Sequence, residues 1–193
     1  MKSSGRKGLS PVAGYSLVEM MMTLAIALIL LSVAMPMMMS AIQGYRLSSV
    51  AQQTANLINL TRYAAIRHNM VISLQKKVQN GNTILFVDLN GDTVLDANEP
   101  QVMLPQDMQI ANGQPLTPDA TTTGIALTQD FTSQITFDYR GTVNFAPGAP
   151  MATYFLALGF VNQAQYGLRA VTVAPMGQTK MWKSVAGSGW SGM

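Results

Sequence analysis

The strongest constraint on this chain is a boundary at Gly14, where a polar, basic segment gives way to an apolar run. The segment before the boundary carries Lys2, Arg6 and Lys7, and the run after it extends to Ile42 with Glu19 as its one charged residue. A cationic segment ahead of an apolar run is typical of an export signal, because positive charge stays cytoplasmic while the apolar helix enters the bilayer. Because the small residue precedes the run, cleavage there leaves the helix on the mature chain.

The apolar run is long enough to cross a membrane. Met20 to Ile42 is apolar apart from a few hydroxyl residues and Pro36, and at about 1.5 Å per residue such a helix spans a hydrocarbon core of about 30 Å. Pro36 removes one backbone donor, which favours a kink or local melting of the helix. The alternative is an ordinary proline tolerated within a membrane helix.

Beyond Gly44 the apolar residues recur every three or four positions. This spacing predicts an amphipathic helix that packs one stripe on a core, with Arg46, Arg62 and Arg67 facing elsewhere. We expect the helix to end near Asn69, and we interpret His68 as a helix-end residue rather than a ligand or base. The predicted stripe is Leu47, Val50, Thr54, Leu57, Ile58, Thr61 and Ala65.

After Asn69 the period changes to two, which predicts strands. A turn at 79–82 joins the first two, residues 105–133 are predicted to be mostly loop, and 124–127 is a candidate short strand. One helix followed by hairpins favours an α+β fold with antiparallel sheets packed on the helix. The expected organisation is a leader (1–14), an apolar helix (15–43), an amphipathic helix (44–69) and a β domain (70–193). The predicted strands are 71–74, 83–87, 101–104, 134–138, 141–145, 154–158, 169–173 and 179–182.

The Gly14–Glu19 segment resembles the prepilin leader of type IV pilins and type II secretion pseudopilins. The resemblance implies that a prepilin peptidase cuts after Gly14 and methylates the new amine of Tyr15, where the family usually has Phe. Glu19 falls at the fifth mature position, where the family carries its glutamate. It is implied to meet the N-terminus of a neighbouring subunit and set axial register.

Physical chemistry supports a partner for Glu19. A carboxylate inside an apolar helix costs about 2.5 to 3.5 kcal/mol on insertion scales. A new α-amino group, with a pKa of about 7.7 to 8, is a cation that can pair with it. The alternative is an acid near the helix end that reaches the membrane interface.

Three later phrases are similar to the GspH/FimT-like family of minor pseudopilins: 57–69, 135–141 and 171–180. The resemblance implies a non-enzymatic subunit of a type II secretion pseudopilus or type IV pilus, with other pilins or pseudopilins as partners. It also implies a single-pass inner-membrane protein with its C-terminal domain in the periplasm. No cofactor is implied, and the chain has one histidine and no cysteine, so we find no catalytic constellation and no thiolate metal site.

An acidic segment between 88 and 99 is a candidate calcium loop. Its oxygen-bearing side chains occupy positions 1, 3, 5, 9 and 12 of the calcium-loop template, although Thr93 stands where the template has glycine. The alternative is a polar hairpin turn built around Asn90-Gly91. The candidate ligands are Asp88, Asn90, Asp92, Asp96 and Glu99.

The C-terminal region is a candidate nucleic-acid surface. Arg169, Lys180 and Lys183 lie near Trp182, and cations beside stacking rings suit nucleic-acid contact. The alternative function is therefore a FimT-like minor pilin that binds DNA, with Trp182 in the core as the competing interpretation. The raw charge is poor evidence for it, because removal of three leader cations leaves 12 − 3 = 9 basic against 9 acidic residues.

Charge is also unevenly distributed along the chain. Eight acids lie between Asn69 and Asp138, and no acid follows Tyr139. We therefore expect a folded domain with two electrically opposite ends, an asymmetry that can orient neighbouring subunits. The alternative is ordinary solvated surface charge.

Overall fold

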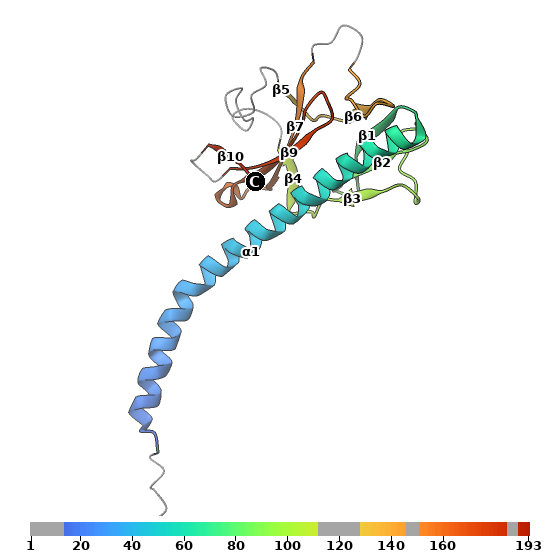
Figure 1. The fold of residues 1–193 in the computed structure, drawn as a ribbon. Helices are drawn as coiled ribbons and strands as arrows, with labels where there is room; N and C mark the ends of the chain where they lie inside the picture. Colours follow the sequence, from blue (N-terminus) through green and yellow to red (C-terminus); the bar gives the residue numbers. More distant parts are fainter. Residues whose placement is uncertain (1–13, 112–127, 146–150, 185–188) are drawn as a thin grey trace, which may run out of the picture. The chain divides into compact units, whose positions relative to one another are not determined.

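The computed structural model describes residues 14–111, 128–145, 151–184 and 189–193. The chain divides into two compact units, Met1–Ala41 and Ile42–Met193, which are described separately. Helix α1 (Leu17–His68) contributes to both units. Figure 1 shows the helix and the strands that follow it.

In the first unit, α1 carries a bare apolar surface. An 18-residue window within the helix has a mean hydropathy of 2.4 and is 0% buried, and its length and composition suffice to cross a membrane. The hydroxyls of Thr23, Ser32 and Ser40 each donate to a carbonyl three residues earlier, so each hydroxyl has a hydrogen-bond partner within the helix. The helix continues through Pro36, so it is not melted there in this structure, and the predicted kink stays a prediction.

In the second unit, α1 buries the predicted stripe. All seven predicted residues are buried, together with Ala51 and Ala55. The hydroxyls of Thr54 and Thr61 donate to the carbonyls of Val50 and Leu57, which removes the cost of burying them.

The helix ends at His68 with a Schellman cap. Asn69 adopts a φ of 51°, and the N–H groups of Asn69 and Met70 donate to the carbonyls of Ile66 and Ala65. His68 is exposed at this end of the helix.

Two sheets pack against the helix stripe. The first has the order β3-β2-β1-β6, and the second has the order β10-β9-β8-β7-β4, with β5 also paired to β7. A single apolar core joins α1 to both sheets, and a smaller cluster of Phe155, Ala157, Ala170 and Trp182 lies on the other face of the second sheet. The strands are β1 (Ile72–Gln79), β2 (Asn82–Asp88), β3 (Gln101–Met103), β4 (Met108–Ala111), β5 (Thr128–Asp130), β6 (Gln134–Phe137), β7 (Thr153–Phe160), β8 (Leu168–Val173), β9 (Thr179–Ser184) and β10 (Trp190–Gly192), with a 3₁₀ turn η1 (Ala164–Tyr166).

The structure confirms the α+β class and corrects several details of the predicted strands. Residues 105–133, predicted to be mostly loop, contain two short strands that the prediction missed: β4 and β5 pair with the two halves of β7, and β5 does so in parallel. Residues 141–145 are not a strand, since Val143 forms only an isolated bridge with Phe137. The candidate strand 124–127 lies outside the described residues. The predicted turn at 79–82 is confirmed: Asn80 and Gly81 have φ values of 52° and 78°, as a two-residue hairpin of type I′ requires.

Polar contacts fix the helix to the sheets at both ends of the stripe. Near its start, Arg46 pairs with Asp107 at 3.3 Å and the Ser48 hydroxyl accepts from Arg169 at 3.0 Å. Near its end, the Asn59 side chain accepts from the Thr179 hydroxyl at 3.2 Å. Arg46 and Arg62 therefore contact the β strands and loops, although their sequence pattern placed them away from the core.

Arg62 lies where the three family-like phrases meet. Its Nε donates to the carbonyl of Gly141 at 2.9 Å. Gly141 and Gly177 have φ values of 77° and 76°, and a Cβ on Gly177 would collide with the Gly141 carbonyl. These two turns can approach Arg62 only because both positions are glycine.

We expect Gly177→Ala to lower the free energy of unfolding of the globular unit by about 2 to 4 kcal/mol, from left-handed backbone strain and overpacking. Gly81→Ala is the matched control, because Gly81 has a φ of 78° with nothing within 4 Å of its Cβ position. It should cost only the backbone strain, about 1 to 2 kcal/mol. Denaturant unfolding measures both, and equal costs would contradict the steric role of Gly177.

Candidate functional site

The predicted cleavage site lies in accessible chain. Gly14 and Tyr15 precede the helix, which begins at Leu17. Tyr15 is 82% exposed, and no atom lies within 4 Å of a Cβ placed on Gly14. The peptide bond between them is therefore outside helical hydrogen bonding and open to a peptidase.

Glu19 lies in the first turn of α1 and is exposed. A carboxylate at this position is favoured by the partial positive charge of the helix N-terminus. Tyr15, whose amine would be the new N-terminus after cleavage, is four residues earlier. The carboxylate is thus available for a cation on another molecule, and its pairing with a neighbouring N-terminus stays a prediction.

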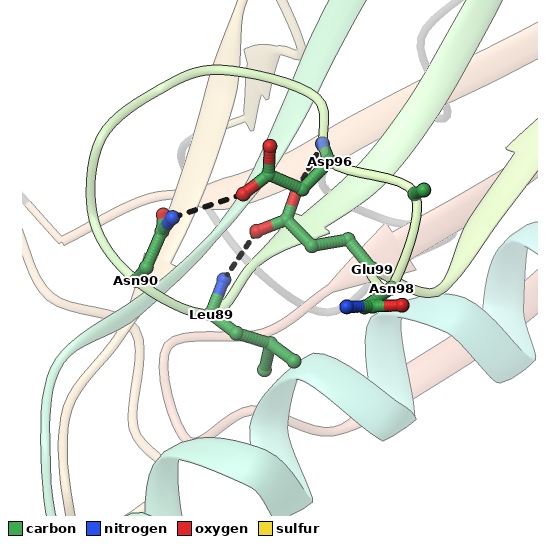
Figure 2. Close-up of a pocket in the computed structure, with 6 residues that line it drawn as sticks. Leu89, Asn90, Asp96, Asn98 and Glu99 are labelled. Carbon is green, nitrogen blue, oxygen red and sulfur yellow. Dashed lines mark hydrogen bonds between the residues drawn. The ribbon is translucent and has the colours of Figure 1, made fainter.

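The acidic segment forms a long connection between β2 and β3. These strands pair antiparallel, from Ile84 opposite Met103 to Phe86 opposite Gln101. Because β2 ends at Asp88 and β3 begins at Gln101, Asn90-Gly91 is part of a longer loop rather than a tight hairpin turn. Figure 2 shows this loop with Glu99 directed back toward Leu89 and Asp96.

The two carboxylates at the ends of the calcium template are used by the loop itself. Asp88, 2% exposed, accepts from the N–H groups of Gly91 at 2.7 Å and Thr93 at 3.1 Å. Glu99, 7% exposed, accepts from the N–H groups of Leu89 at 2.9 Å and Asp96 at 3.1 Å. Each carboxylate therefore closes one end of the loop with charge-assisted hydrogen bonds.

The middle of the loop is held by Asn90. Its amide nitrogen donates to Asp92 at 2.9 Å and to Asp96 at 3.1 Å. Thr93, which replaces the glycine of the template, has a φ of 62°, a strained conformation for a β-branched residue. Within the described ranges, no three His, Cys, Asp or Glu side chains form a group that could hold a metal ion. Calcium binding by this loop stays a prediction.

The three candidate nucleic-acid residues do not share one face of the second sheet. Arg169 is directly opposite Lys183 in the β8–β9 ladder, whereas Lys180 is opposite Thr172, so Lys180 projects from the other face. Arg169 is half-buried, and it donates to Ser48 and to the Leu168 carbonyl. Burial lowers the pKa of its guanidinium.

Trp182 belongs to the core, as the competing interpretation held. It is 8% exposed, and its indole N–H donates to the Thr172 hydroxyl at 3.0 Å. Arg169 is therefore a structural contact and Trp182 is unavailable for stacking on bases. DNA binding stays a prediction without a common surface for its three cations.

Sequence reasoning did not find the local role of Asp138. Its carboxylate accepts from the N–H groups of Arg140 and Thr142, both at 2.9 Å, and so closes the turn that presents Gly141 to Arg62. Burial raises the pKa of Asp138, but the hydrogen bonds from Thr142 and Arg140 and the charge of Arg140 outweigh it and hold the pKa below its ordinary value. The Asp-x-x-Gly spacing typical of a turn was the signal that could have shown it.

The hydrogen bonds of Glu99 predict that its carboxylate stabilises the loop between β2 and β3. Glu99→Ala should lower the free energy of unfolding by about 1 to 3 kcal/mol, because two backbone N–H groups lose their acceptor. Asp92→Ala, at an exposed position, should cost less. A melting temperature that rises in millimolar calcium, and no longer rises in Asp92→Ala, would instead show that the loop binds calcium.

Comparison with known proteins identifies the family. The model described as Type II transport protein GspH matches residues 50–177, which is more than half of the chain. The model described as Prokaryotic N-terminal methylation motif matches residues 9–35, across the Gly14 boundary and most of the apolar run. A search of curated proteins found no match.

One solved structure is similar to this chain. It is described as the minor pseudopilin EpsH from the Type 2 Secretion System of Vibrio cholerae. The two share 15% sequence identity with a TM-score of 0.44, over 74% of this chain and 99% of the other. From the match over residues 50–177, the chain belongs to the GspH family of type II transport proteins, and it carries the N-terminal methylation motif ahead of the family domain.

Proposed function

We propose that this protein is a minor pseudopilin of a type II secretion pseudopilus, or a minor pilin of a type IV pilus, and that its role is structural. The observation that carries the proposal is the union of two modules on one chain: the methylation motif over 9–35 and the GspH domain over 50–177. The folded domain supplies surfaces for neighbouring subunits, and the motif supplies the processing signal. No catalytic step is needed for this role.

The bare apolar surface of α1 in the first unit supports the proposal that the protein is held in the inner membrane before assembly. Its surface is unburied within the protein, so lipid or the helices of other subunits must cover it. The basic leader favours an orientation in which the leader is cytoplasmic and the globular unit is periplasmic. The prepilin peptidase then acts on the cytoplasmic side, where Gly14 lies.

Assembly in this proposal exchanges lipid contacts for contacts between helices. The hydroxyls of Thr23, Ser32 and Ser40 are hydrogen-bonded within α1, so no unsatisfied hydroxyl is placed in lipid or between helices. Glu19 is the exception, because its charge has no partner on its own helix. Pairing with the N-terminal amine of a neighbour would satisfy it in a low-dielectric setting, where such a pair is strong.

Processing tests the first part of the proposal. The mature protein should begin at Tyr15 with a methylated amine, which N-terminal mass spectrometry detects. Gly14→Val should block cleavage by placing a branched side chain at the cut, and Gly44→Ala, at the far end of the apolar run, should leave it unchanged. An intact Met1 in the wild type, or cleavage beyond Ala41, would contradict the prepilin interpretation.

Glu19 tests the second part. Glu19→Ala should insert and be cut after Gly14, because the peptidase reads the glycine boundary, but it should fail to enter the filament. Co-purification with partner pseudopilins, beside a cleavage assay, measures both steps. Thr23→Ala is the matched control, since Thr23 lies one turn further along α1 and its hydroxyl bonds only the Met20 carbonyl. If Glu19→Ala assembles as well as the wild type, the register hypothesis is wrong.

A further inference from the structure

A groove lies between α1 and the edge of β9, within the unit Ile42–Met193. It has a volume of about 530 Å³, which is within the usual range for binding sites in proteins. Gln52, Ala55 and Asn59 line it from one face of α1, since they are spaced three and four positions apart. Residues 179–182 of β9 line it from the other side, and residues 192–193, at the end of β10, complete the lining.

The edge of β9 that borders the groove is only partly paired. β10 pairs with β9 from Trp182 to Ser184, and the Met193 N–H donates to the Met181 carbonyl at 3.0 Å. In an antiparallel strand every second residue directs its N–H and C=O to the same side, so the backbone groups of Thr179 point to this edge too. No described strand pairs with Thr179 on that side. The groove therefore contains a backbone donor and a backbone acceptor that a partner could bond.

Two amide side chains of α1 line the same space. Asn59 accepts from the Thr179 hydroxyl at 3.2 Å through its oxygen, which leaves its NH₂ group to donate. Gln52 donates to Asn56 at 3.1 Å through its nitrogen, which leaves its carbonyl oxygen to accept. Neither remaining group bonds to a residue that the structure describes. Both walls thus have a donor and an acceptor available, as an extended backbone requires of its partners.

The charge of the groove is positive. Lys180 is exposed, and it is the only charged residue among the described residues that line the groove. The α1 wall adds no charge, because the sequence between Arg46 and Arg62 has no charged residue. No acid follows Asp138, so β8, β9 and β10 have no carboxylate side chain to pair with Lys180. A lone cation of this kind favours an anionic partner.

We propose that this groove binds an extended, acidic segment of a different subunit of the same filament. The segment bonds the backbone of Thr179, as a strand added to a sheet edge does, and it places a carboxylate beside Lys180. Residues directly opposite each other in an antiparallel pair have Cβ atoms about 4.5 to 5.5 Å apart, so we expect the acidic residue opposite Lys180.

The inference rests on the proposed function. A minor subunit is surrounded by subunits of other kinds, so the segment comes from another chain and the contact does not propagate through copies of this one. One residue of strand edge and one exposed ion pair contribute little free energy in dilute solution. The contact therefore depends on the high local concentration that neighbours in a filament provide, and it is tested in cells that assemble the filament.

A photo-crosslinking amino acid at Gln52 of the full-length protein tests the contact. It is expected to link to a different subunit, and mass spectrometry of the product should map the link to a segment that contains Asp or Glu. The matched control position is Gln53, which is also exposed but bonds Ser49 and is not among the lining residues. Its yield of the same product should be several-fold lower. Equal yields at the two positions, or a link to a second copy of this chain, overturn the inference.

Two variants of Thr179 test the backbone contact. Thr179→Val removes the hydroxyl that bonds Asn59 and keeps the N–H, whereas Thr179→Pro removes both. Thr179 is the first residue of β9, a position where proline is tolerated, and its N–H lies outside the β8–β9 ladder. At equal protein levels in the membrane, the Gln52 crosslink should persist in Thr179→Val and fall several-fold in Thr179→Pro. Equal crosslinks in the two variants contradict a backbone contact.

Charge reversal is an independent measurement that leaves the backbone unchanged. Lys180→Glu should lower the Gln52 crosslink several-fold, and Lys180→Arg should keep it. Lys183→Glu is the matched control, because Lys183 is exposed on the same strand but is not among the lining residues. Equal losses in Lys180→Glu and Lys183→Glu overturn the inference, as does a Lys180→Glu yield equal to the wild type.

Co-purification with partner pseudopilins is measured in parallel, so that the two proposals can fail separately. A protein that enters the filament without the Gln52 crosslink overturns this inference alone. A wild type that never enters the filament overturns the proposed function.

Discussion

The packing of one stripe of α1 against two sheets is the interaction on which the globular unit depends. Nine side chains of the helix are buried, and three of them are alanines that let the strands approach closely. Neither sheet covers its own apolar face, and small sheets are marginal in water without such cover. The helix is therefore the common element of the core, and the polar contacts along it set its position against both sheets.

In its first half the same helix has the opposite surface pattern. There the apolar side chains are exposed all around, and no part of the chain that the structure describes covers them. One continuous helix thus has two surface patterns. Near Gly44 it changes from an apolar surface on all sides to a single buried stripe. This change in pattern separates an anchoring segment from a folding segment without a break in the helix.

Features set by local periodicity could be predicted from the sequence. The stripe on α1, the Asn80-Gly81 hairpin and most of the strands follow from spacing and turn chemistry alone. β4, β5 and β10 were missed because each has only three or four residues, too few to show a period of two, and is held by its pairing with β7 or β9. Residues 141–145 alternate like a strand, but Gly141 in a left-handed turn leaves Val143 only an isolated bridge.

The candidate site was predictable in its residues but not in their contacts. Counting oxygen ligands in the acidic loop could not show that Asp88 and Glu99 are directed to backbone N–H groups. The three cations near the C-terminus looked like a common surface until the β8–β9 register placed Lys180 on the other face. Likewise, helical spacing placed Arg62 away from the core, whereas its contact comes from a turn 79 residues later.

The contacts at Arg46, Ser48, Asn59 and Arg62 also determine how the unit bears a pull along its helix. They are spread along the length of the buried stripe, and each joins the helix sideways to a strand or loop. A force along the helix axis therefore loads them in shear, all at once, and does not peel them one by one. In the proposed filament role, a load on the apolar part of α1 would therefore pass into the domain through all of these contacts together.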